Sequence, residues 1–310
     1  MVWKAVRVKA DKDHRMKANK QLKIIFVVVA ALVFGVSGYG QKSVKGVTNG
    51  SPYFEEKLNS KLMGRDMPYR IIVPGVANID AASKVRYPVI YLLHGLYGHY
   101  SNWTDKTKLT EYFRSYKFII VMPEGGNGWY SDSATAAADK YESYIVKELI
   151  PEIDAKYPTI VDREHRIIAG LSMGGYGSIK FGIKYPSMFS LVGSFSGAVN
   201  AAAFNEKNAG AIGKTVDAAF GADDGPARRS NDIFEMLKTI SPDAVKGLPY
   251  VYLSCGTDDF LFQSNRDLDQ IIIEKKITHE YREHPGAHTW EFWDDQIREF
   301  LAVADRSIKK

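Results

Sequence analysis

Short apolar runs alternate along the chain with segments whose apolar residues follow a helical spacing. Continuous apolar runs of this kind are typical of strands buried on both faces of a sheet. The predicted strands cover residues 67–74, 87–93, 118–123, 167–169, 191–196, 250–255 and 278–283. Helical spacing predicts helices from about residue 140, directly after Ser172, over 261–275 and over 290–304.

Strands that alternate with helices predict an α/β fold, with a mostly parallel central sheet and helices on both faces. Residues 198–248 interrupt this alternation, because they are rich in Ala, Gly, Asn and Asp and show weak periodicity. We expect them to form an insertion at the C-terminal rim of the sheet. This composition fits a lid or substrate wall, and it fits an irregular surface excursion equally well.

The N-terminal residues have the pattern of a targeting segment. Residues 16–23 are basic, residues 24–36 are apolar, and small residues follow at 38–40. This order predicts a signal peptide over residues 1–40, with Met16 as an alternative start, and a mature domain over 41–310. We therefore expect a secreted or periplasmic protein, and the alternative is an uncleaved membrane anchor.

Charge and cysteine content narrow the range of partners. The chain of 310 residues has a net charge of +5, but residues 1–40 alone contain eight Lys or Arg and two Asp. The remaining chain is therefore close to neutral, at −1, and gives no electrostatic reason to expect a nucleic-acid partner. Cys255 is the only cysteine, which excludes an intrachain disulfide.

Residues 170–174 read Gly-Leu-Ser-Met-Gly, the G-x-S-x-G pattern. An apolar run precedes this pattern and a helical pattern follows it, as expected for the nucleophile elbow of an α/β-hydrolase fold. The elbow is so sharp that Ser172 would present its hydroxyl at the C-terminal edge of the sheet, and a Cβ at either flanking glycine would clash. A glycine- and serine-rich turn without chemistry is the alternative.

A serine nucleophile needs a base, and the base needs an acid that orients it. In this fold the chain order is serine, acid, histidine. The turn after residues 250–255 offers Asp259, preferred over Asp258, and the loop after the last strand offers His288, preferred over His284. The alternative role of the aspartates is to cap the following helix.

The two histidines are four residues apart, so a metal pair is an alternative. Pro285 and Gly286 prevent the helix that this spacing would need, and no cysteine cluster or zincin glutamate accompanies the pair. We therefore expect no metal and no cofactor. The backbone N–H groups of Leu96 and Met173 are the predicted oxyanion donors, and His94 is predicted to hydrogen-bond loop backbone.

Aromatic residues gather in segments that we expect at the same rim of the sheet. Aromatic faces suit sugar rings or aryl acyl groups. Trp103, Trp129 and Tyr130 are the candidate substrate-binding residues, whereas Trp290 and Trp293 are expected to pack the last helix.

With these motifs in place, the chain resembles the esterase D-like family, from about Tyr69 to Leu301. The family includes S-formylglutathione hydrolases, tributyrin esterases, feruloyl and acetyl-xylan esterases, and mycolyltransferases. The resemblance implies an α/β-hydrolase fold, with Ser172, Asp259 and His288 as the catalytic triad and Leu96 and Met173 at the oxyanion hole. Residues 170–177 and 127–130 are most similar to the tributyrin and feruloyl esterase branch.

The expected function is that of an exported serine carboxylesterase, acting on feruloyl or acetyl esters of plant polysaccharide or on small acyl esters. The alternatives are an acyltransferase of the mycolyltransferase type, an S-formylglutathione hydrolase and, as a non-enzyme, an inactive carbohydrate-binding domain. The sequence does not define the acyl group, the alcohol or the oligomeric state, and a membrane partner is expected only through an uncleaved leader.

Overall fold

The computed structural model describes residues 52–75 and 84–308. The predicted signal peptide lies outside this part of the chain. No helix within the described ranges is both long and apolar enough to cross a membrane.

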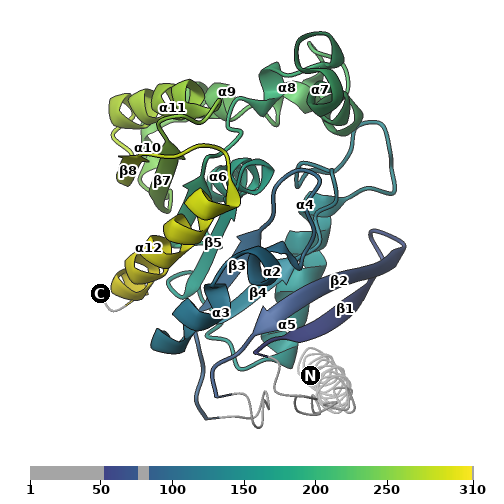
Figure 1. The fold of residues 1–310 in the computed structure, drawn as a ribbon. Coiled ribbons are helices and arrows are strands. Elements are labelled where there is room, and N and C mark those ends of the chain that lie inside the picture. Colours follow the sequence, from purple (N-terminus) through teal and green to yellow (C-terminus); the bar gives the residue numbers. More distant parts are fainter. Residues whose placement is uncertain (1–51, 76–83, 309–310) are drawn as a thin grey trace, which may run out of the picture. The chain divides into compact units, whose positions relative to one another are not determined.

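An eight-stranded sheet forms the centre of residues 52–308, in the order β1-β2-β4-β3-β5-β6-β7-β8 (Figure 1). Strands β3 to β8 pair in parallel, whereas β1 pairs with β2 and β2 with β4 in the antiparallel direction. The mostly parallel sheet confirms the predicted fold class. The strands are β1 (Phe54–Ser60), β2 (Arg65–Ile72), β3 (Val89–Leu93), β4 (Ile119–Pro123), β5 (Arg166–Leu171), β6 (Leu191–Phe195), β7 (Tyr250–Gly256) and β8 (His279–His284).

Helices cover both faces of this sheet, as the alternation of strands and helices predicts. The longer ones follow the parallel strands and pack back onto the sheet. The helices before the insertion are α2 (Asn102–Lys106), α3 (Leu109–Tyr112), α4 (Tyr141–Tyr144), α5 (Ile150–Lys156) and α6 (Met173–Lys184). A π-helical turn, Ile145–Leu149, joins α4 to α5, and a 3-10 turn, Phe113–Ser115, follows α3. The last two helices are α11 (Phe262–Glu274) and α12 (Trp290–Ile308).

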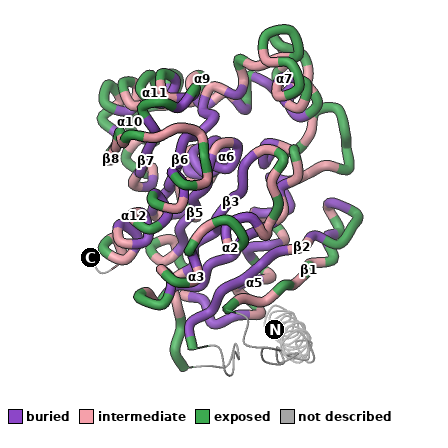
Figure 2. The backbone as a smooth tube through the Cα atoms, in the orientation of Figure 1, coloured by how far each residue is buried: buried purple, intermediate pink, exposed green. Residues whose placement is uncertain are grey.

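The strands separate two hydrophobic clusters. Successive side chains of a strand point to opposite faces, and in β3 Tyr91 and Leu93 belong to one cluster whereas Ile90 and Leu92 belong to the other. The first cluster is completed by α5, α6 and α11, and the second by α3 and α12. Figure 2 shows the central strands buried and the exposed positions concentrated on outer helices and loops. Burial on both faces explains the continuous apolar runs of β3 and β4 and the largely apolar sequences of β5 and β6.

The predicted insertion, residues 198–248, is largely helical. It contains a 3-10 turn at Ala201–Ala203 and helices α7 (Glu206–Phe220), α8 (Pro226–Arg229), α9 (Ile233–Thr239) and α10 (Pro242–Val245). Buried Arg228 connects its parts, donating to Asp217 Oδ1 and to the carbonyl oxygens of Phe204 and Gly221, each at 2.6 Å. The segment therefore has a packed structure of its own rather than an irregular path.

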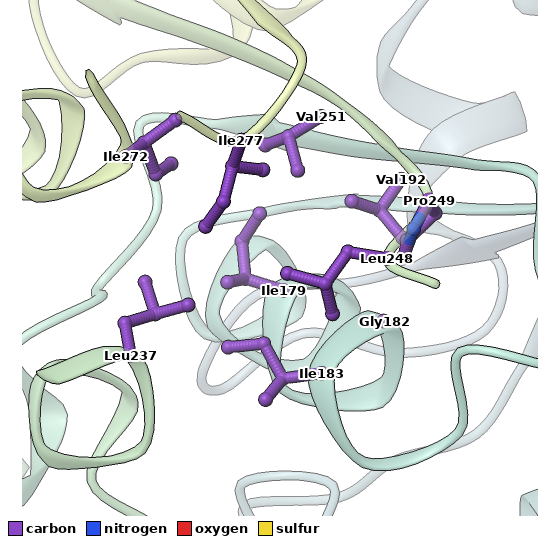
Figure 3. Close-up of a pocket in the computed structure, with 10 residues that line it drawn as sticks. All are labelled: Ile179, Gly182, Ile183, Val192, Leu237, Leu248, Pro249, Val251, Ile272 and Ile277. Carbon is purple, nitrogen blue, oxygen red and sulfur yellow. The ribbon is translucent and has the colours of Figure 1, made fainter. Parts of the chain in front are cut away.

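Close packing continues where α6, α9 and α11 approach β6 and β7. Figure 3 shows the apolar side chains that line a cavity there, of only about 10 Å³. A space of this size without polar partners suits neither a ligand nor a stable water molecule. We therefore treat it as part of the core.

Candidate active site

The turn from β5 into α6 holds Ser172 in a strained backbone conformation, with φ 52° and ψ −117°. A Cβ at Gly174 would lie 2.5 Å from the carbonyl oxygen of Leu93, and a Cβ at Gly170 would lie 2.6 Å from the backbone of Gly174. Only glycine fits such contacts with backbone atoms. The two glycines therefore allow the sharp elbow that presents the Ser172 hydroxyl at the C-terminal edge of the sheet.

Three side chains from distant parts of the chain meet at this edge. The Ser172 hydroxyl lies 3.0 Å from Nε2 of His288, and Nδ1 of the same ring lies 2.8 Å from Oδ2 of Asp259. Because an ionised carboxylate only accepts hydrogen bonds, Nδ1 carries the proton and Nε2 is free to accept the serine proton. The structure thus brings together the three residues predicted as nucleophile, base and acid.

Asp259 is placed and ionised by its surroundings. Its side chain is fully buried, and Oδ1 accepts a hydrogen bond of 2.8 Å from the N–H of Leu261. Burial on its own would raise the pKa of Asp259, but the hydrogen bonds from His288 and Leu261 outweigh it and lower the pKa overall. The carboxylate therefore stays charged at neutral pH and can stabilise an imidazolium.

The neighbouring Asp258 is exposed, and its backbone N–H donates to the carbonyl oxygen of Gly286 at 2.9 Å. This bond ties the acid turn to the loop that carries the histidine. The carboxylate that faces His288 is that of Asp259. It accepts a turn hydrogen bond from Leu261, and neither aspartate caps α11, which has no side-chain cap.

The predicted oxyanion donors lie on either side of the serine. Met173 is the first residue of α6, and Leu96 lies on the loop after β3. Within the described ranges, neither backbone N–H has a hydrogen-bond acceptor. Both are thus available to an oxyanion at the elbow.

His94 fixes the loop that carries Leu96. Its ring donates from Nδ1 to the carbonyl oxygen of Gly95 at 2.8 Å and accepts from the N–H of Gly125 at 2.9 Å. The hydroxyl of Tyr130 donates to the carbonyl oxygen of His94 at 2.9 Å. His94 therefore bonds loop backbone, as predicted.

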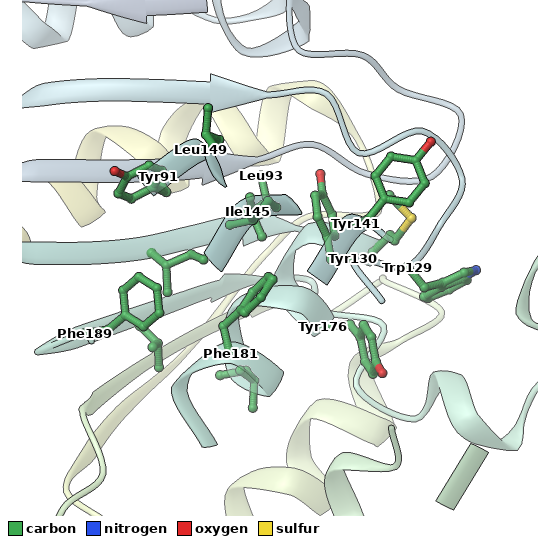
Figure 4. Packing of buried hydrophobic residues seen from close by; sticks show 14 of the residues in the cluster. Tyr91, Leu93, Trp129, Tyr130, Tyr141, Ile145, Leu149, Tyr176, Phe181 and Phe189 are labelled. Carbon is green, nitrogen blue, oxygen red and sulfur yellow. The ribbon is translucent and has the colours of Figure 1, made fainter. Parts of the chain in front are cut away.

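The three aromatic residues predicted to contact substrate are buried, with at most 1% of each residue exposed. The indole N–H of Trp103 donates to Leu93 O at 3.1 Å, and that of Trp129 donates to Thr215 at 2.9 Å. Figure 4 shows Trp129 and Tyr130 among the side chains of the first hydrophobic cluster. Contrary to our expectation, none of the three presents a surface to a ligand; they support the loops around the site instead.

The two histidines considered as a metal pair do not converge. His288 bonds Ser172 and Asp259, whereas His284 ends β8 with its Nε2 3.5 Å from Glu299. Across the described residues, no group of three or more His, Cys, Asp or Glu side chains is arranged to hold a metal ion.

Two exposed aromatic residues lie beside the site. The sequence pattern placed Tyr97 among the aromatic residues of this rim but not among the substrate-binding candidates, and it did not single out Phe260. Tyr97 follows Leu96 and is 58% exposed, and Phe260 follows Asp259 and is 68% exposed. The Phe260 ring lies 4.7 Å from the His288 ring, centroid to centroid. The sequence signal for both residues was their position next to a predicted site residue. Their exposure, however, depends on the tertiary structure and could not be predicted from the sequence.

The parallel sheet, the elbow between β5 and α6 and the order serine, acid, histidine define an α/β-hydrolase fold with a serine hydrolase arrangement. Comparison with known proteins agrees. The family described as "Putative esterase" matches residues 60–303. An acetyl esterase of Caldicellulosiruptor saccharolyticus is 31% identical over 214 residues, which cover 67% of this chain and 79% of that protein. The chain belongs to this esterase family and is a carboxylic ester hydrolase.

Other relatives and solved structures extend the comparison. The diacylglycerol acyltransferase/mycolyltransferase Ag85A of Mycobacterium leprae is 23% identical over 286 residues, 81% of this chain and 82% of that protein. A ferulic acid esterase structure has a TM-score of 0.70 at 25% identity and covers 82% of this chain and 98% of its own. An S-formylglutathione hydrolase of Staphylococcus aureus has a TM-score of 0.68 at 23% identity, with coverage of 81% and 98%, and this last likeness concerns the fold alone.

Proposed function

We propose that this esterase works through a covalent acyl-enzyme on Ser172. The observation that carries the proposal is the continuous hydrogen-bonded line from the Ser172 hydroxyl through His288 to buried Asp259, at 3.0 and 2.8 Å. In such a line the histidine removes the serine proton as the serine oxygen attacks, and the aspartate stabilises the imidazolium that forms.

The first half-reaction forms the acyl-enzyme. The bond from Ser172 Oγ to the ester carbonyl carbon forms, and the serine proton moves to Nε2 of His288. The N–H groups of Leu96 and Met173 donate to the oxyanion of the tetrahedral intermediate. The carbon–oxygen bond to the alcohol then breaks, and His288 returns its proton to the leaving oxygen, which restores the neutral imidazole.

The second half-reaction repeats these steps with water. His288 takes a proton from the water, the water oxygen bonds the acyl carbon, and the bond to Ser172 breaks as the serine recovers its proton. An alcohol in place of water gives acyl transfer. The mycolyltransferase relative supports transfer as a second candidate function for this chain.

We infer acetyl or aryl-acyl esters, including feruloyl esters of plant polysaccharide, as the substrate class. The similarity to an acetyl esterase and to a ferulic acid esterase structure supports this choice. The insertion fits a role as a wall of the substrate site. Its α7 residues Thr215, Ala218 and Ala219 line a cavity of about 200 Å³ together with Asn127. Asn127 in turn accepts a hydrogen bond of 2.9 Å from the N–H of Tyr97, beside the oxyanion loop.

This proposal can be tested by assaying the purified protein on acetyl, butyryl and feruloyl esters and on acetylated xylan. We expect hydrolysis of at least one ester that Ser172→Ala abolishes, together with covalent labelling of Ser172 by a phosphonate. Adding an alcohol acceptor and measuring the ratio of transfer to hydrolysis separates the two candidate functions. Ligand binding without any Ser172-dependent turnover would instead indicate an inactive binding domain and refute the proposal.

A further inference from the structure

Phe260 is an exposed apolar residue that lies directly beside His288, the proposed catalytic base. Single exposed apolar side chains are common and usually need no explanation. Phe260, however, is 68% exposed while its ring lies 4.7 Å from the His288 ring, at an interplanar angle of 56°. It therefore contacts the proposed base on one side and solvent on the other.

Two buried residues, Trp293 and Asp259, also contact the imidazole. The Trp293 ring lies 4.8 Å from His288 at an angle of 87°, and Trp293 is only 6% exposed. Trp293 packs in turn on Trp290, at 5.2 Å. Asp259 occupies the Nδ1 side. These contacts hold the ring in place, and Phe260 is the exposed aromatic residue that packs against it.

The chemistry of His288 identifies the part of the ester that comes closest to it. When the tetrahedral intermediate breaks down, Nε2 must reach the oxygen of the leaving alcohol to return its proton. The carbonyl oxygen, in contrast, faces the N–H groups of Leu96 and Met173. The alcohol side of the ester therefore lies toward His288, and the oxyanion lies away from it.

We propose that Phe260 is the specificity-determining residue for the alcohol side of the ester, where its exposed ring packs against a ring-bearing alcohol such as a benzyl group or the apolar face of a sugar. This inference rests on the proposed acyl-enzyme function. By microscopic reversibility, the same ring contacts an acceptor alcohol during acyl transfer. Aromatic faces favour such contacts because they provide apolar area together with a preferred stacking geometry.

The test compares two esters that share the same acyl group and differ in their alcohol. Benzyl acetate and methyl acetate release alcohols of similar acidity, but only the first carries a ring. Both form the same acetyl-enzyme, so the ratio of their kcat/KM values reports only the steps up to and including alcohol release, and the shared deacylation step does not affect it. We expect Phe260→Ala to lower the ratio of benzyl to methyl acetate by about tenfold, the scale of one lost aromatic contact, and Phe260→Tyr to preserve it.

Ile273→Ala is the matched control, because Ile273 is an apolar residue of α11 that is 52% exposed and lies outside the proposed site. It should leave the ratio unchanged. An equal loss on both esters in Phe260→Ala would mean that Phe260 only shields His288, and would overturn the inference. A loss of kcat/KM that depended on the length of the acyl chain, with the alcohol kept the same, would also overturn the inference. If the wild type showed no Ser172-dependent turnover of any ester, the proposed function itself would fail. This result differs from an unchanged ratio between the two esters, which would refute only the role of Phe260.

Discussion

Removing the charge of Glu142 should destabilise the protein strongly, because it would leave a buried lysine without its counter-ion. The Lys180 side chain, on the elbow helix α6, is fully buried, with its Nζ 3.0 Å from Glu142 Oε2. Burial lowers the pKa of Lys180 to about 8, although Glu142 acts in the opposite direction. Burial likewise disfavours the Glu142 carboxylate, but the charges of Lys180 and Lys184 lower its pKa to about 2.

These pKa values set the size of the effect. A carboxyl pKa that falls from 4.5 to about 2 on folding corresponds to about 3 kcal/mol of stability. The lysine pKa that falls from 10.5 to about 8 corresponds to an opposing term of about 3 kcal/mol. Both shifts contain the same attraction between Glu142 and Lys180, so they are not added. Breaking the pair by removing the Glu142 charge costs about 3 kcal/mol, in the range found for other buried pairs.

Urea unfolding at pH 7 should accordingly show that Glu142→Gln loses about 3 kcal/mol, and that adding Lys180→Met recovers at least half of it. Glu164→Gln is the matched control, because Glu164 pairs with Arg163 while 68% exposed, and it should change stability by less than about 0.5 kcal/mol. In the wild type, the Glu142 contribution is present above pH 4.5 and should be lost as the pH falls toward 2. A Glu142→Gln variant within 1 kcal/mol of the wild type, or a double variant as unstable as the single one, would refute the reasoning.

Three further predictions concern the site and the leader. Ser172→Ala and His288→Ala should each lower kcat by about 10⁶, and the double variant should lose little more, because residues of a triad act as a unit; strictly additive losses would contradict the mechanism. Asp259→Asn should lower kcat by about 10⁴ through the wrong histidine tautomer, whereas Asp258→Asn should have little effect, and a reversed ranking would move the acid to Asp258. N-terminal sequencing of the exported protein should find a start near Gly40, and a mature chain that retains the apolar run would argue for an anchor.

The inner strands of the sheet could be predicted because they are buried on both faces. Strands β3, β4 and β6 begin within two residues of the predicted runs. Strand β1 was missed: its sequence, FEEKLNS, contains no apolar run, and its residues alternate between intermediate and exposed up to Ser60. An edge strand of this kind is stabilised by its pairing with β2, which sequence periodicity does not report.

The triad could be predicted because chain order and local turns restrict it. Spacing also favoured Asp259 over Asp258, and the structure supplies the physical difference, since one carboxylate is buried against His288 and the other is exposed. The substrate-binding aromatics could not be predicted in this way. Trp103 and Phe260 are both large and apolar, yet one is fully buried against Leu93 O and the other is 68% exposed. Their surroundings come from segments far apart in the sequence.

Backbone strain is concentrated at the same edge of the sheet. Tyr97, Trp129, Tyr130, Ser172 and Ser196 all have φ between 47° and 59°. Non-glycine residues in this region cost about 1–3 kcal/mol each and persist only where their surroundings hold them. Here the surroundings do so: the N–H of Ser172 donates to a β6 carbonyl at 3.0 Å, that of Ser196 to a β7 carbonyl at 2.7 Å, and that of Tyr97 to a side-chain amide at 2.9 Å. The buried aromatic residues thus serve the site by holding strained loops in place, and we expect substrate contact at the exposed ones.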